Sequence, residues 1–125
     1  MTQFTLLFGS ISGFLAIAFD AFGAHGLKSR VTPERLDVWN TAAHYHLIHS
    51  LVLVALTAIL MAHPSPILHR AAFTFIAGIF VFSGSLYTLV LTDVGILGAI
   101  TPLGGLALMV GWAMCGWFAW TQLGT

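Results

Sequence analysis

Four long apolar segments, separated by very few charged residues, constrain what this chain can fold into. They cover residues 4–24, 43–62, 71–91 and 103–121. A helix of about 20 residues, at about 1.5 Å per residue, spans about 30 Å, which is the thickness of a bilayer's hydrocarbon core. The sequence therefore predicts an all-α membrane protein, a bundle of four transmembrane helices.

The composition leaves no way to build a water-facing surface. Only 6% of the residues are charged and 58% are hydrophobic, whereas a soluble domain carries about 25% charged residues. Few residues remain for loops once four spans are drawn, so we expect a single integral membrane domain over residues 1–125. The net charge of zero argues against a nucleic-acid partner, because phosphate binding needs a cationic face.

The first apolar segment is expected to be a retained helix with one close-packing face. It begins with Met1-Thr2-Gln3 and lacks the positive residues that open a secretory signal peptide. Gly9, Gly13, Ala16 and Asp20 fall on one helical face. Small residues on such a face allow another backbone to come close.

The segment 28–37 is the one strongly polar stretch, with five of the eight charged residues. Thr32-Pro33-Glu34 is typical of a helix start, with Thr32 as the N-cap and Pro33 in the first turn. We therefore expect a short amphipathic interfacial helix here. It either continues into the second span or bends near Asn40-Thr41.

Basic residues in short loops set the expected orientation. Lys28, Arg30 and Arg35 lie in the first loop, whereas the opposite side carries Arg70 and the N-terminal amine. This bias predicts a cytoplasmic first loop with both termini outside. The later link, residues 92–102, is apolar but too short to span, so we expect it to pack on protein or to lie at the interface.

Polar side chains inside a membrane are costly, so they are the default candidates for function. The candidate polar site consists of these residues: Asp20, His25, Tyr45, His46, His49 and Tyr87. His46 and His49 are three residues apart and share a helix face, whereas His44 points about 200° away from His46.

Three interpretations of these residues stay open. The histidines can hydrogen-bond to neighbouring helices and stabilise packing, or an Asp/His/Tyr chain can relay protons. A metal or haem site is the third, but one helix supplies at most two histidines, so Asp20 or His25 would have to complete it. The spacing matches no standard zinc signature, and no nucleophile elbow Gly-x-Ser-x-Gly occurs.

Four motifs, taken together and in this order, resemble one known family. They are Ala21–Leu27 (AFGAHGL), the Tyr45…His49-Ser50-Leu51 stretch, Phe82–Tyr87 (FSGSLY) and Gly98–Gly105 (GAITPLGG). The chain is similar over nearly its whole length to the small YgdD-like membrane proteins, which include human transmembrane protein 256. The resemblance implies a compact four-helix protein of the bacterial inner membrane, and it implies no activity.

The resemblance also sorts the candidate residues. Those that match the family pattern are His25, Tyr45, His49, Tyr87, Thr101 and Pro102. His46 stands where the family often has Gln or another polar residue, and Asp20 stands where a small residue is common. The resemblance therefore implies that a shared function would use His25, Tyr45 and His49.

The sequence as a whole predicts a non-enzymatic, multi-pass membrane protein with an inter-helix His/Tyr network. It would handle a small solute, a proton or a lipid, or support a membrane complex. Membrane lipids are expected partners, together with further copies of the chain or another membrane protein. No cofactor or metal is expected in this interpretation; the alternative is a metal- or haem-binding membrane enzyme that uses histidines.

Overall fold

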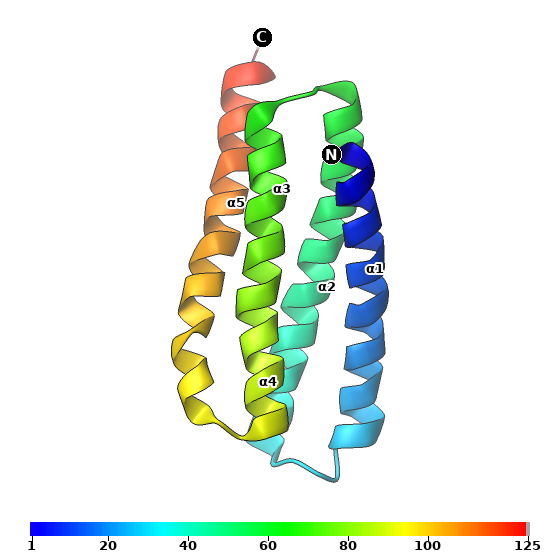
Figure 1. Cartoon of the computed structure of the whole chain (residues 1–125), viewed down its shortest axis with the longest axis vertical. Helices are drawn as coiled ribbons and strands as arrows, with labels where there is room; N and C mark the ends of the chain where they lie inside the picture. The colour runs from blue at the N-terminus through cyan, green and yellow to red at the C-terminus, as the bar shows by residue number, and fades with distance from the viewer. Residues whose placement is uncertain (125) are drawn as a thin grey trace.

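The computed structural model describes residues 1–124, and over that range the chain forms helices and no strands (Figure 1). In chain order the elements are α1 (Thr2–Phe22), the π-helical turn η1 (Gly23–Leu27), α2 (Pro33–Ala62), α3 (Pro66–Gly78), the π-helical turn η2 (Ile79–Ser83), α4 (Gly84–Thr92), the 3₁₀ helix η3 (Gly95–Ala99) and α5 (Thr101–Gln122).

These elements join into four rods that are long and apolar enough to cross a membrane. The rods cover Thr2–Leu27, Pro33–Ala62, Pro66–Thr92 and Gly95–Gln122. The all-α fold with four spanning helices is therefore confirmed. Each rod extends beyond the apolar run that predicts it, and the fourth rod includes η3 from the link 92–102.

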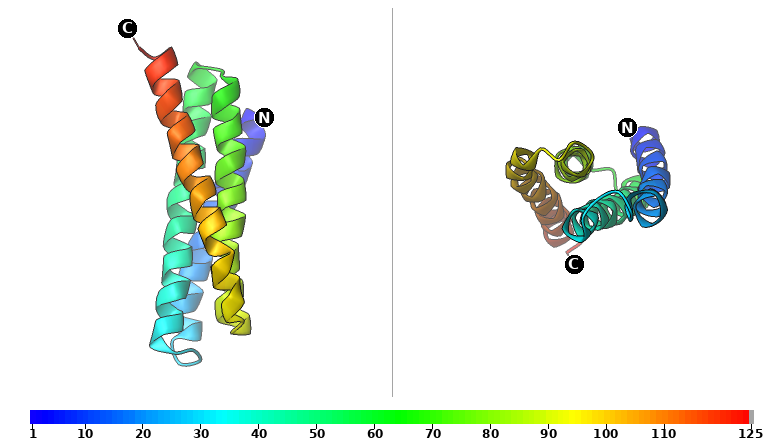
Figure 2. Two further views of the ribbon diagram at one scale, coloured as in Figure 1. Left: turned by 90° about the vertical axis from the view of Figure 1, so that its left-hand side faces the viewer. Right: turned by 90° about the horizontal axis from the view of Figure 1, so that it is seen from below.

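The four rods form an open row in which α1 and α5 are the outer members. α1 packs mainly against α2, and α5 packs mainly against α3 and η2. Figure 2 shows the rods from the side and from below, with α1 and α5 on opposite flanks. α1 has one principal neighbour, and in Figure 1 α2 is seen between α1 and the rod formed by α3, η2 and α4.

The amphipathic segment forms the first turns of α2, and no separate short helix precedes the second span. Thr32 is the N-cap, and its side-chain oxygen accepts a hydrogen bond from the Arg35 backbone N–H at 3.2 Å. Pro33 and Glu34 occupy the first turn, as the sequence predicts. No residue interrupts helical geometry after Pro33, so the helix runs on unbroken into the membrane.

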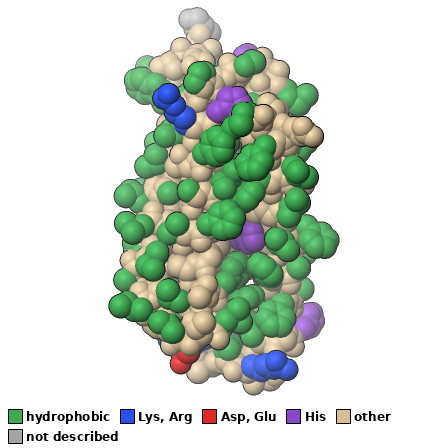
Figure 3. All heavy atoms as spheres, viewed as in Figure 1, with side chains coloured by type: hydrophobic (Ala, Val, Ile, Leu, Met, Phe, Trp, Pro, Cys, Tyr) green, Lys and Arg blue, Asp and Glu red, His purple; other side chains and the backbone are tan. Residues whose placement is uncertain are grey.

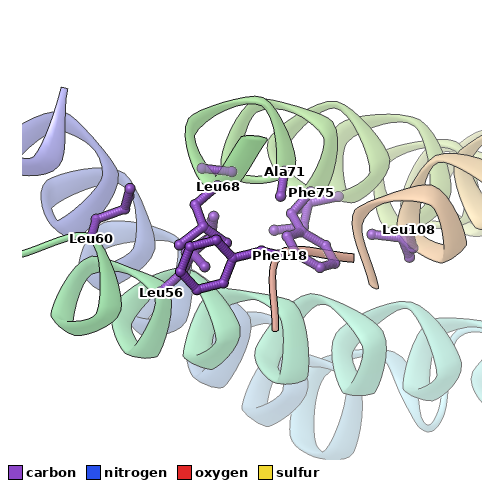
Figure 4. Packing of buried hydrophobic residues seen from close by; sticks show 10 residues of the cluster. Leu56, Leu60, Leu68, Ala71, Phe75, Leu108 and Phe118 are labelled. Atoms are coloured by element: carbon purple, nitrogen blue, oxygen red, sulfur yellow. The ribbon is translucent and has the colours of Figure 1, made fainter. Parts of the chain in front are cut away.

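Most of the apolar core lies between α2, α3 and α5. Figure 4 shows this cluster, in which Phe75 of α3 and Leu53 of α2 are completely buried. Its buried members are Leu53, Leu56, Leu60, Leu68, Ala71, Ala72, Phe75, Ile79, Leu108 and Phe118. Since lipid tails are as apolar as leucine, close packing rather than burial from water is what this cluster contributes.

A second cluster lies near the first loop and centres on Trp39. This tryptophan is only 2% exposed, and its indole N–H donates to the Phe19 carbonyl at 2.7 Å. Its ring packs against Tyr87 at 4.6 Å between centroids and against Phe22 at 5.8 Å. Trp39 therefore connects the end of α1 to α2 and α4.

The chain past α4 closes the first-loop end of the molecule. Asp93 ends α4 in the left-handed conformation, with a φ of 57°, and its carboxylate accepts from Arg35 at 3.1 Å. This ion pair links the start of α2 to the turn after α4. The apolar link follows as η3, and Ile96 there is 76% exposed, so it lies at the surface of that end.

Glycines permit the closest helix approaches. A Cβ added at Gly9 would lie 3.0 Å from the Leu53 Cβ, and one at Gly104 would lie 2.7 Å from the Phe82 Cα. Gly9 and Ala16 are buried in the α1 face, as expected from the small-residue pattern. Asp20 is exposed and does not join that face.

The contact at Gly104 gives a stability prediction with an internal control. Gly104→Ala should destabilise the fold by about 1–3 kcal/mol, because the new methyl group meets the Phe82 backbone, which cannot rotate away. Gly116→Ala in the same helix meets nothing within 4 Å and should be neutral or stabilising by up to about 1 kcal/mol. Unfolding midpoints of the two variants in detergent micelles check this. Equal midpoints would contradict the close approach of α5 and η2.

Candidate functional site

His46, near the middle of α2, joins three helices. Its Nδ1 lies 3.0 Å from the Tyr87 hydroxyl of α4, and its Nε2 lies 2.9 Å from Ser12 Oγ of α1. Ser12 Oγ is in turn 2.7 Å from Ser50 Oγ, and the Ser50 hydroxyl donates to the His46 backbone carbonyl at 2.7 Å. All four side chains are buried.

The number of available hydrogens fixes the direction of every bond in this network. The His46 carbonyl can only accept, so the single hydrogen of Ser50 is used there. Ser12 must then donate to Ser50, and His46 Nε2–H must donate to Ser12. A neutral imidazole leaves Nδ1 as an acceptor, so the Tyr87 hydroxyl donates to it. The network therefore runs in one direction, from Tyr87 to the His46 carbonyl.

His49 belongs to a different network on the side of α5. Its Nδ1 lies 2.7 Å from the Tyr45 carbonyl, so Nδ1 carries the hydrogen. The Trp112 indole N–H donates to Nε2 at 3.1 Å. The His49 ring also contacts Phe75, at 5.7 Å between centroids. His49 is thus the Nδ1–H tautomer, the opposite of His46.

The two histidines therefore share a helix face without sharing a site. Every ring nitrogen of His46 and His49 already has a partner within the protein. Over residues 1–124, no group of three His, Cys, Asp or Glu side chains is arranged to hold a metal ion.

The remaining candidates from the sequence lie apart from these networks. Asp20 is exposed near the end of α1, and His25 is exposed in η1. Tyr45 is 40% exposed, and its ring packs on Phe82 at 4.5 Å and on His49 at 6.1 Å between centroids. The structure thus brings Tyr87 to His46 and Tyr45 to His49, whereas Asp20 and His25 make no hydrogen bond to any of these four within residues 1–124.

Sequence reasoning missed Ser12, Ser50 and Trp112. Ser50 lies four residues after His46, a spacing that permits its hydroxyl to reach the preceding turn's carbonyl. Ser12 lies within the small-residue stretch of α1, where it is indistinguishable from a packing residue. Trp112 carried no signal, because its role depends on which face of α5 turns toward α2.

Beside the His46 network, an apolar groove of about 370 Å³ runs between α1 and the η2–α4 segment. Ser12, His46 and Tyr87 lie at its floor, and almost all of the surface exposed in it is carbon. One wall consists of large α1 side chains, and the other includes Phe80 and Gly84. Figure 3 looks onto this side of the molecule, which is covered by hydrophobic side chains.

Aromatic contacts hold α1 against the opposite wall at the upper end of the groove. Phe4 packs on Phe73 of α3 at 6.3 Å between centroids, and Phe8 packs on Phe80 at 5.8 Å. At the other end, Phe19 packs edge-on against Tyr87 at 5.1 Å. The groove is therefore elongated and lies between two aromatic contacts.

Comparison with known proteins identifies the family. Residues 19–105 match the family described as "Protein of unknown function (DUF423)", and the chain belongs to it. It is 44% identical over 111 residues to the UPF0382 membrane protein YwdK of Bacillus subtilis, covering 87% of this chain and 89% of that one. It is 38% identical to the UPF0382 membrane protein SAB0533 of Staphylococcus aureus, covering 87% and 88%. No solved structure matches.

These relatives are membrane proteins, which agrees with the four spanning helices, and they establish a small membrane family whose function is unknown. The chain spans nearly the full length of the relatives named above.

For neutral rings, the hydrogen count predicts that His46 and His49 have opposite tautomers. In nitrogen-15 NMR of protein carrying ring-labelled histidine in bilayers, His46 should be protonated at Nε2 only and His49 at Nδ1 only. His46→Gln and His49→Gln assign the signals. Identical tautomers, or a doubly protonated ring at neutral pH, would contradict the two networks.

The two tyrosines provide a matched pair for testing the energy of the His46 network. Tyr87→Phe removes the donor to His46 Nδ1 and should destabilise the protein by about 1 kcal/mol. Tyr45→Phe should change stability by less than about 0.5 kcal/mol, because within residues 1–124 the Tyr45 hydroxyl makes no hydrogen bond. Denaturant unfolding of both variants in mixed micelles measures the difference. An equally large loss of stability in Tyr45→Phe would contradict the assignment of the hydrogen bond to Tyr87 alone.

Proposed function

We propose that this protein is a non-enzymatic, multi-pass membrane protein that holds one hydrocarbon chain of a membrane lipid in the groove between α1 and η2–α4. The carrying observation is the groove itself, which is open toward the bilayer and lined almost entirely by carbon. Pockets of a few hundred Å³ with a few polar groups at defined positions are typical of small-molecule sites.

The dimensions of the groove fit a single extended chain. Its α1 lining runs from Phe4 to Phe19, which is about 22 Å at about 1.5 Å per residue. The groove is therefore long and narrow for its volume of about 370 Å³, a shape that suits one extended hydrocarbon chain.

The saturated floor favours an apolar occupant over an ion. A metal would need free ring nitrogens, and those of His46 and His49 are already used. A proton path needs an entrance and an exit, but the His46 network ends on a backbone carbonyl. An apolar chain forms no hydrogen bonds, so the polar atoms keep their partners when it binds.

The location forms part of the proposal. We assign the protein to the bacterial inner membrane, because its relatives are bacterial membrane proteins. The first loop is assigned to the cytoplasm, because Lys28, Arg30 and Arg35 lie there. Kinship with the YgdD-like proteins is likewise proposed, on the four shared motifs.

Photolabelling tests the lipid-binding groove directly. Protein reconstituted in phosphatidylcholine, with a small fraction of phosphatidylcholine carrying a diazirine in its acyl chain, is irradiated and digested. Label should concentrate on Ile11, Leu15 and Phe80, which line the groove, above its level at Leu103 and Met109, which are exposed on α5.

A groove-filling variant supplies the matched comparison. Gly84 lines the groove and a Cβ there meets nothing within 4 Å, so Gly84→Leu should fill it without disturbing the fold. Gly116→Leu on α5 also meets nothing within 4 Å, but it lies outside the groove. Groove labelling should fall several-fold in the first variant and stay unchanged in the second. Uniform labelling of all exposed faces, or no effect of Gly84→Leu, would overturn the proposal.

A further inference from the structure

α2 presents one continuous seam of exposed residues to the bilayer. Exposed positions recur along it at alternating spacings of four and three residues, which is the repeat of a coiled-coil face. The members of this seam are Asp37, Thr41, His44, Ile48, Leu51, Ala55, Ala58 and Ala62. α1 packs closely beside α2, whereas α5 packs mainly against α3 and η2. In the view from below in Figure 2, α2 lies at the margin of the molecule, so the seam is accessible to a partner.

His44 of the seam lies within the hydrocarbon region. α2 has 30 residues and is about 45 Å long, which exceeds a hydrocarbon core of about 30 Å by about 15 Å. The rise from Pro33, where α2 begins, to His44 is about 16 Å. Even if all of the excess length lay at the first-loop end, His44 would be inside the hydrocarbon. An exposed imidazole there has no water to bond to, so it needs a partner.

Thr41 and His44 differ from the buried polar side chains of α2, which all bond within the protein. Those buried side chains are His46, His49, Ser50 and Thr57. Thr57, for example, donates to the Leu53 carbonyl one turn back. Within residues 1–124, neither the Thr41 hydroxyl nor the His44 imidazole makes a hydrogen bond. Their donors and acceptors are therefore unused in a single copy of the chain.

We propose that the seam of α2 binds a second copy of this chain, inserted in the same direction, to form a parallel dimer. All copies share one orientation, because the same basic loop directs each of them. A two-fold axis along the membrane normal then places each seam residue opposite its own counterpart. A threonine hydroxyl and a neutral imidazole each carry a donor and an acceptor, so Thr41 and His44 can bond to the same residues of the second copy. A different protein would need such groups at matching depths, which a second copy supplies by symmetry.

The rest of the seam suits the same arrangement. Ala55, Ala58 and Ala62 let two helices approach closely toward the opposite end. An apolar hollow of about 390 Å³ adjoins Ala58 and Ala62 on the α5 side and leaves room for side chains of the second copy. Asp37 lies only about 6 Å from the start of α2, where water weakens the repulsion between two carboxylates. No seam residue lines the lipid-binding groove, so the dimer and the groove are independent of each other.

Disulfide crosslinking in bilayers tests the seam with a matched pair of positions. Cys115→Ala first removes the single native thiol. Ile48 and Leu47 are 39% and 41% exposed, but they point about 100° apart on the helix. On oxidation, Ile48→Cys should give at least about fivefold more linked dimer than Leu47→Cys, whose counterparts lie beyond the Cβ separation of about 4 Å that a disulfide needs. Leu106→Cys, exposed on α5, measures random collision.

The polar contacts are tested by the monomer–dimer equilibrium in liposomes, measured by energy transfer between labelled copies. His44→Leu should weaken dimerisation about fivefold, because it removes an inter-helix hydrogen bond. Ala58→Leu should weaken it at least as much, because the larger side chain separates the two helices. His25→Leu, which replaces an exposed histidine outside the seam, should leave the equilibrium unchanged.

Three results would overturn the proposal. The first is a chain that stays monomeric in bilayers, in which case the seam meets lipid headgroups or another protein. The second is equal crosslinking at Ile48, Leu47 and Leu106. The third is a dimer that both His44→Leu and Ala58→Leu leave unchanged, because such a dimer would form through another face.

Discussion

The structure depends on one constraint, which is that a hydrogen-bonding group in the hydrocarbon region has no water to bond to. His46 lies near the middle of α2 and must find partners from other helices. It finds Ser12 on α1 and Tyr87 on α4, and the Ser12–Ser50 contact returns the chain of bonds to α2. These contacts specify how far α1 and α4 rotate about their own axes. A rotation of either helix would leave a buried polar atom unpaired, at a cost of about 1–3 kcal/mol.

Every hydrogen of this network is used inside the protein, which explains how polar side chains can line an apolar groove. The hydrogens of Tyr87, His46, Ser12 and Ser50 are all used within the protein. The groove can therefore present carbon to the bilayer even though polar residues form its floor. The π-helical turn η2 lies on the opposite wall, where Ser83 donates to the Ala42 carbonyl at 2.7 Å. That bond fastens the wall to α2 and leaves Gly84 facing open space.

The parts of the fold that could be predicted from the sequence are those that depend on local information. Apolar length predicts the spans, and Thr32-Pro33 predicts the start of α2 because a cap acts within one turn. The His46 and His49 networks could not be predicted in the same way. Side chains three residues apart diverge by about 60° on a helix, which is enough to turn one toward α1 and the other toward α5. Which neighbouring helix each side chain meets depends on how distant parts of the chain pack together.

The same reasoning explains which of the candidate site residues have a hydrogen-bond partner and which do not. Tyr87 was chosen because polar groups in spans are costly, and that cost is indeed met by a bond to His46. Asp20 and His25 were chosen by the same rule, but they lie where α1 emerges and are exposed. The rule therefore applies best to residues deep within a span. The sequence gives that depth only approximately.

The open row of helices is what makes a lateral groove possible. In a closed bundle, α1 would pack along its length against a second neighbour, and side chains would fill the space above His46. Here the aromatic contacts between α1 and the opposite wall are the Phe4–Phe73 and Phe8–Phe80 pairs toward one end of the groove and the Phe19–Tyr87 pair toward the other. Aromatic rings separate two backbones more than glycine or alanine does, and α1 uses its small residues against α2 instead. The division of α1 into one small face and one aromatic face therefore determines that it can lie tightly on α2 while staying apart from α4.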